Sequence, residues 1–105
     1  MANMEVKSSF KGDAAVLEVS GSVDIDHGDE LKGAIFNLIE KKNLNIVVDM
    51  SGVSYIDSSG LGILVGAVTH ARRAGGNLKL ANISPGVKEI LNLTRLSSFF
   101  EIGYI

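Results

Sequence analysis

Cysteine and tryptophan are absent from this sequence of 105 residues, and it contains only one proline. The lack of cysteine excludes disulfides, thiolate metal sites and cysteine nucleophiles. Long runs of positive charge are missing as well, because the longest are the pairs Lys41-Lys42 and Arg72-Arg73, and the net charge is −2. Nucleic-acid binding requires clustered cations that release counterions, so we expect no direct nucleic-acid partner.

The sequence also lacks a membrane-spanning run. Its longest weakly polar stretch, residues 58–71, is too short and too rich in glycine to cross a bilayer. Glu5 and Lys7 interrupt the apolar residues near the N-terminus, so no signal-peptide core is present there. Apolar residues make up 46% of the chain and charged residues 21%, which is ordinary for a soluble protein. We expect a cytoplasmic protein with one domain over residues 1–105 and no membrane partner.

The first segment of the chain is predicted to form a β-hairpin. Residues 4–11 and 15–19 both favour strands, and Gly12 lies in a turn signal between them. Gly21 is expected to close the second strand. A loop or a short extended piece is then expected at residues 23–26.

An amphipathic helix is predicted next, because apolar residues recur at helical spacing at Leu31, Ile35, Leu38 and Ile39. Asp26 or His27 is expected to start this helix and Asn43 to end it. Lys41 and Lys42 are expected near its C-terminal end, where positive charge matches the helix dipole.

The centre of the chain is predicted to be a strand followed by a helix. Residues 46–48 form a short apolar run that is typical of a strand covered on both faces. After a loop, an apolar segment without formal charge extends to Arg72. Either Asp57 or Ser58 is a good N-cap for this helix, because a short side-chain oxygen can accept from unpaired backbone N–H groups.

The last third of the chain predicts one more strand at residues 78–83 and a helix that starts at Ser84-Pro85, an N-cap followed by proline. The residues that recur at helical spacing along one face of that helix are Val87, Ile90, Leu91 and Thr94. Residues 99–105 are a candidate final strand. Strands alternating with helices predict an α/β fold with a mixed, largely parallel sheet of four to five strands and helices mainly on one face.

Ligands and partners of such sheets usually meet the protein where a strand leads into a helix, which here is the position of Ser58 and Ser59. A nucleotide-binding loop is not expected, because Val65 replaces the last glycine of the dinucleotide fingerprint and no Walker lysine follows. We therefore expect no cofactor. A serine hydrolase is not favoured either, because Ile56 or Asp57 stands where the nucleophile elbow needs glycine.

The two histidines do not favour catalysis or a metal site. His70 lies about three helical turns from Ser58, roughly 18 Å along the axis, which is too far for a general base. His27 is expected at the start of the first helix, where exposure to solvent is the more common outcome. The pair shows no clustered metal-ligand pattern, so we expect no metal.

Residues 49–62, which read Asp-Met-Ser-Gly-Val-Ser-Tyr-Ile-Asp-Ser-Ser-Gly-Leu-Gly, resemble the signature of STAS domains, in particular of bacterial anti-sigma factor antagonists. Three further stretches agree in order and spacing: Gly21-Ser22-Val23-Asp24, residues 75–80 with their glycine pair, and Ser84-Pro85 with Leu93-Thr94-Arg95-Leu96. The resemblance covers nearly the whole chain. Arg95 departs from it, since the family usually has glycine there, which predicts a different turn or a strained residue.

The resemblance implies a function. In the antagonists, the first serine of the motif is phosphorylated by a cognate anti-sigma factor that is also a serine kinase, and this position is Ser58. The unphosphorylated protein is then expected to bind the kinase and free a sigma factor, and a serine phosphatase is expected to reset it. The implied partner-binding residues are Asp24, Ile56, Asp57, Ser58, Ser59, Gly60 and Leu61. The alternative is a STAS protein that serves a transporter or a sensory complex.

Several of these residues also have simple structural interpretations. Ser58 alone would be an ordinary N-cap, and Asp57 is expected to act as a cap, as a kinase contact or as both. Asp24 is assigned to the partner surface by analogy only. Ile56, Leu61 and Ile63 are most simply core residues, but the helix is more apolar all round than a surface helix, so we expect at least one of them to be exposed for a partner.

Overall fold

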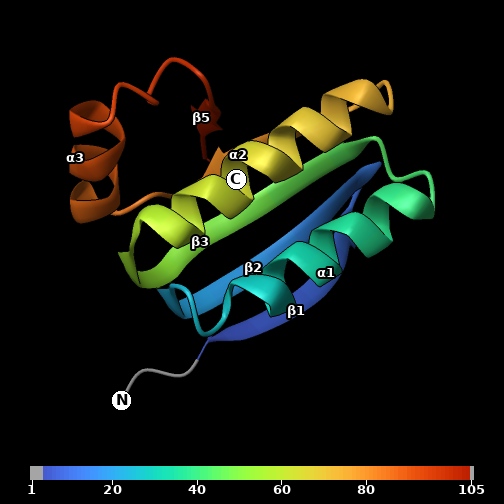
Figure 1. Cartoon of the computed structure of the whole chain (residues 1–105). Coiled ribbons are helices and arrows are strands. Elements are labelled where there is room, and N and C mark those ends of the chain that lie inside the picture. Colours follow the sequence, from blue (N-terminus) through green and yellow to red (C-terminus); the bar gives the residue numbers. More distant parts are fainter. Residues whose placement is uncertain (1–3, 105) are drawn as a thin grey trace.

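The computed structural model describes residues 4–104. Figure 1 shows its elements, which are, in chain order, β1 (Glu5–Lys11), β2 (Ala14–Val23), α1 (Gly28–Glu40), β3 (Asn45–Ile56), α2 (Ser58–Arg73), β4 (Asn77–Ala81), α3 (Pro85–Leu93) and β5 (Glu101–Gly103).

The strands form one five-stranded sheet in the order β1-β2-β3-β4-β5. β1 and β2 are antiparallel, as the predicted hairpin requires, and the remaining neighbours are parallel. The predicted α/β class with a mixed sheet is confirmed. The predicted final strand is present but is only three residues long, and Ile105 lies outside the described residues.

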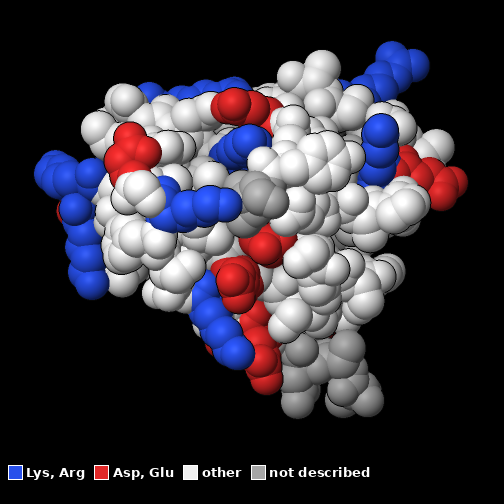
Figure 2. Space-filling model, turned by 180° about the vertical axis from the view of Figure 1, so that it is seen from behind, with Lys and Arg blue, Asp and Glu red and all other residues white. Residues whose placement is uncertain are grey.

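The helices pack on one face of the sheet, as predicted. Figure 1 shows α1 and α2 lying across that face, and α3 contributes Val87 and Leu91 to the same core. Alternate strand residues such as Leu17, Val48 and Leu80 supply the core from the sheet side. The opposite face carries a small apolar cluster of Val16, Val47 and Ala81. Figure 2, which views the molecule from the back of Figure 1, shows charged side chains of both signs on this side.

Two strands are longer than the sequence pattern predicts. The pairing of β3 with β4 ends at Asp49, but β3 itself continues to Ile56. We expected this largely polar stretch to form a loop. β2 likewise continues through Gly21 to Val23, with Gly21 at φ +89° next to a register shift. The two extensions pair with each other, so each supplies the backbone partners that the other lacks.

The helix ends largely follow the predicted signals. Ser84 caps α3 by accepting from the amide of Val87 at 3.2 Å. α1 ends at Glu40 with Lys41 as its C-cap, so the two lysines lie near the C-terminal end of the helix, as predicted.

Two residues with a left-handed backbone conformation follow the ends of α3 and β4. Arg95 has φ +60°, so the predicted strained position after α3 is confirmed. The fourth strand ends at Ala81 rather than at Ile83, because Asn82 turns the chain with φ +57°.

One close backbone approach fixes the start of α2. Gly60 lies in the first turn of this helix, and a Cβ atom added to it would be 2.3 Å from the carbonyl oxygen of Val23 in β2. The amide of Asp57 donates to that same oxygen at 3.2 Å. A side chain at position 60 would therefore push the helix start away from the end of β2.

We predict that Gly60→Ala lowers the free energy of unfolding by about 1–3 kcal/mol, the usual cost of overpacking. Gly62→Ala is the matched control, because apart from its chain neighbours and the helix's own backbone nothing lies within 4 Å of a Cβ at that position. This control should instead stabilise the protein by up to about 1 kcal/mol through helix propensity. Urea denaturation followed by circular dichroism measures both, and equal shifts for the two variants would contradict the prediction.

Candidate functional site

The ends of β2 and β3 bring the predicted site residues together. Val23 and Ile56 are neighbours in the parallel register, and each strand leads directly into a segment that carries predicted residues. The β2–α1 loop contains Asp24, and α2 begins with Ser58. Residues from two distant parts of the sequence thus meet at one end of the sheet, as expected for a parallel α/β arrangement.

Asp57, and not Ser58, is the N-cap of α2. Its backbone is extended, and its Oδ1 atom accepts from the amide of Gly60 at 2.9 Å. Asp57 is half-buried, whereas Ser58 is exposed as the first residue of the helix. Because the cap is made by the preceding carboxylate, the hydroxyl of Ser58 is available for another role.

The structure buries three of the residues that were predicted to contact a partner. Ile56 is 2% exposed and Leu61 6%, and Gly60 is buried against β2. Direct contact through these three residues does not agree with the structure, and their place is to hold the first turn of α2 against the sheet. Ser59 is half-buried between the exposed and the buried residues.

Asp24 shapes its own loop. Its Oδ1 atom accepts from the amides of Asp26 at 3.1 Å and His27 at 3.2 Å, and it lies 2.9 Å from Nδ1 of His27. His27 is the N-cap position of α1, so this carboxylate joins the loop to the start of that helix. The side chain keeps 22% of its surface exposed, so it borders the site while organising the loop.

Two large apolar residues at this end of the sheet were missed by the sequence analysis. Ile25 is 75% exposed in the β2–α1 loop, and Tyr55 is 53% exposed one residue before the end of β3. Ile25 stands between two aspartates in a segment predicted as a loop, which is a signal that it lacks a place in the core. Ile63, the other candidate for an exposed apolar residue on α2, is half-buried and faces Gly28 of α1.

The electrostatic environment of Ser58 is set by carboxylates and by the helix start. No lysine or arginine occurs between Lys11 and Lys32 or between Lys42 and Arg72, so both segments that form the site lack cationic side chains. Asp57 pairs with the amide of Gly60, which leaves the amides of the first two helical residues at the positive end of the helix dipole.

No hydrogen bond among the described residues joins either histidine to Ser58. Nδ1 of His27 is engaged with Asp24. His70 lies in the last turn of α2 and stacks on Phe36 of α1, with ring centroids 4.4 Å apart. Within residues 4–104, no cluster of three or more His, Cys, Asp or Glu side chains is arranged to hold a metal ion.

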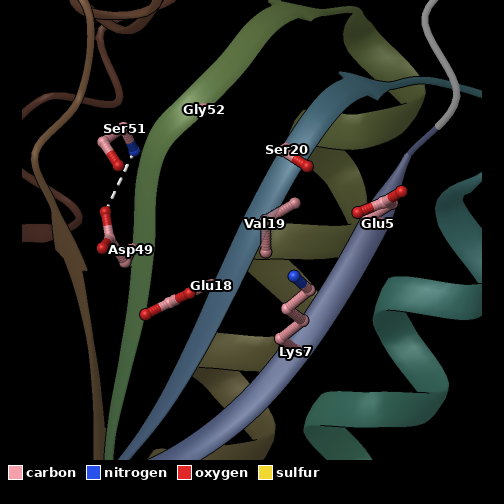
Figure 3. A pocket seen from close by; sticks show the side chains of 8 residues that line it. All are labelled: Glu5, Lys7, Glu18, Val19, Ser20, Asp49, Ser51 and Gly52. Carbon is pink, nitrogen blue, oxygen red and sulfur yellow. Dashed lines mark hydrogen bonds between the residues drawn. The ribbon is translucent and has the colours of Figure 1, made fainter.

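A separate hollow of about 160 Å³ lies on the sheet face that the helices leave uncovered. Figure 3 shows its lining, which comes from β1, β2 and β3: Glu5, Lys7, Glu18, Val19, Ser20, Asp49, Ser51 and Gly52. Asp49 accepts from the amide of Ser51 at 3.0 Å and from the side chain of Asn82 at 3.2 Å. No predicted site residue lines this hollow, so the start of α2 remains the candidate site.

None of the helices in the described part of the chain is both long enough and apolar enough to span a membrane.

Comparison with known proteins identifies the family. The family model described as STAS domain matches residues 3–104. An anti-sigma-B factor antagonist of Bacillus subtilis is 30% identical over 101 residues, which cover 96% of this chain and 90% of that protein.

Solved structures agree with the fold. A crystal structure of an anti-sigma factor antagonist from Mycobacterium paratuberculosis has a TM-score of 0.86 at 23% identity, over 96% of this chain and 86% of that one. The Bacillus cell fate determinant SpoIIAA in its phosphorylated form has a TM-score of 0.71 at 19% identity, over 95% and 90% of the two chains. Anti-sigma factor antagonists are non-enzymatic regulators. The chain belongs to the STAS domain family and, within it, to the anti-sigma factor antagonists.

Proposed function

We propose that the unphosphorylated chain binds an anti-sigma factor that is also a serine kinase, and that this binding releases a sigma factor. The kinase then transfers the γ-phosphoryl group of ATP to the hydroxyl of Ser58, which ends the complex, and a serine phosphatase restores the binding form. The exposure of Ser58 at the start of α2, in a chain of this family, is the observation that carries the proposal.

The docking surface is formed by the exposed residues at this end of the sheet. We call Ile25, Tyr55 and Ser58, together with the half-buried Asp24 and Asp57, the α2-start surface. Two large apolar side chains beside carboxylates suit a partner that offers an apolar contact flanked by lysine or arginine. The buried residues Ile56, Gly60 and Leu61 support this surface from below.

Phosphorylation of Ser58 acts on docking and not on folding. It adds roughly −1.5 to −2 charge at pH 7. At the first position of α2 this charge meets free amides and a favourable dipole, so the domain remains folded. A docked partner must instead remove water from a phosphate beside Asp57, and the segments that form the site contain no cation to neutralise it.

We predict that the anti-sigma factor kinase and ATP place one phosphate on Ser58. Phosphopeptide mapping by mass spectrometry measures the position. Ser59→Ala, at the neighbouring half-buried serine, should still be phosphorylated, whereas Ser58→Ala should not. Phosphate on Ser59, or unchanged phosphorylation of Ser58→Ala, would refute the assignment.

We also predict that Ile25→Ser weakens binding of the anti-sigma factor by about tenfold or more, because an exposed apolar anchor is lost. The matched control is Leu44→Ser. Leu44 is also an exposed apolar residue, but it precedes the first residue of β3, at the other end of that strand from Tyr55. Isothermal titration calorimetry compares the two variants. Both should keep the unfolding midpoint of the parent chain to within a few degrees, since both side chains are exposed. Equal losses of affinity would exclude a local docking surface around Ile25.

A further inference from the structure

The outer edge of β1 is unpartnered in the described chain. β1 is the first strand of the sheet, and within residues 4–104 it pairs only with β2. An edge strand of seven residues presents a row of backbone N–H and C=O groups that can pair with another strand. Its side chains alternate, so that Glu5 and Lys7 border the hollow on the open face, whereas Val6 and Ser8 border a second hollow beside α1.

We propose that a second copy of this chain adds to this edge, with the two β1 strands antiparallel and centred on Ser8. The result is a two-fold symmetric dimer in which one sheet continues through both copies. The α2-start surface lies at the strand ends and not along the β1 edge, so both copies keep Ser58 accessible. This dimer does not depend on the proposed function of Ser58.

The charges on β1 select the register. With Ser8 at the two-fold axis, the facing pairs are Glu5 with Lys11, Val6 with Phe10, Lys7 with Ser9, and Ser8 with Ser8. A shift of the centre to Lys7 would place Lys7 opposite its own copy. A shift to Ser9 would place Lys7 opposite Lys11 instead. Like charges directly opposite each other destabilise antiparallel strands, and opposite charges stabilise them, so of these three registers the one centred on Ser8 is favourable.

The helix-side face of the same register provides an apolar contact. Phe10 is 66% exposed in the isolated chain. The second hollow measures about 200 Å³ and lies between β1 and α1, with this lining: Val6, Ser8, Leu17, Glu30, Ala34, Asn37 and Leu38. Because Phe10 of the second copy faces Val6, its ring is placed at the mouth of this hollow. A cavity of about 150 Å³ already holds a benzene ring. Pairing therefore buries an aromatic side chain that the isolated chain leaves in water.

A single engineered cysteine tests the register. The chain has no cysteine of its own, so Ser8→Cys can form a disulfide only between two copies. Directly opposite residues of antiparallel strands have Cα atoms about 4.5–5.5 Å apart, which is within disulfide range. Ser9→Cys is the matched control, because in this register Ser9 faces Lys7 and its own copy lies beyond the limit of about 7 Å. Under mild oxidation we expect cross-linked dimer from Ser8→Cys and not from Ser9→Cys, and equal or reversed yields would overturn the register.

A charge swap tests the dimer in solution without cross-linking. Within one chain Glu5 faces Ser20 and Lys11 faces Ala14, so neither is opposite a charged residue in the hairpin. We expect Glu5→Lys and Lys11→Glu each to weaken dimerisation by about tenfold or more, and the double variant to restore it. Sedimentation equilibrium of the full chain measures all four proteins, with circular dichroism to verify folding. A parent chain that stays monomeric at every concentration, or a double variant that fails to recover, would overturn the proposal.

Discussion

The contact between the first turn of α2 and the end of β2 is the constraint on which the rest of the site depends. The carbonyl oxygen of Val23 accepts from the amide of Asp57, and only a glycine at position 60 allows the helix to approach that closely. The carboxylate of Asp57 then caps the helix through the amide of Gly60. As a result, Ser58 is the first helical residue, is exposed to solvent and does not cap the helix.

This contact also separates the buried residues at the helix start from the exposed residues around it. Ile56, Gly60 and Leu61 lie beneath the helix start and fix its position, whereas Ile25 and Tyr55 project from the same end of the sheet into solvent. Asp24 organises the loop between them by accepting from two amides. Under the proposed function, a charge added at Ser58 acts mainly on a docked protein, because the residues beneath Ser58 are already buried.

Much of the fold follows from local patterns in the sequence, and the remainder depends on contacts between distant residues. The stripe of α1 and the cap at Ser84 were predicted because each is set by neighbouring residues, whereas the different turn or strained residue at Arg95 was expected from the family resemblance. The extension of β3 to Ile56 was missed, because its polar residues are held by pairing with β2. Tertiary packing likewise decides whether Asp57 or Ser58 caps α2 and whether Ile25 is exposed. A periodic sequence pattern carries no information about such packing.

In the proposed switch, a phosphate on Ser58 changes docking while the domain stays intact. The most direct measurement compares the chain phosphorylated on Ser58 with the unmodified chain in two assays, urea unfolding and titration with the anti-sigma factor. We expect the two forms to have unfolding free energies equal to within about 1 kcal/mol, and the phosphorylated form to lose affinity by at least about a hundredfold. Equal affinity of the two forms, or a phosphorylated chain that is largely unfolded, would contradict the proposed switch.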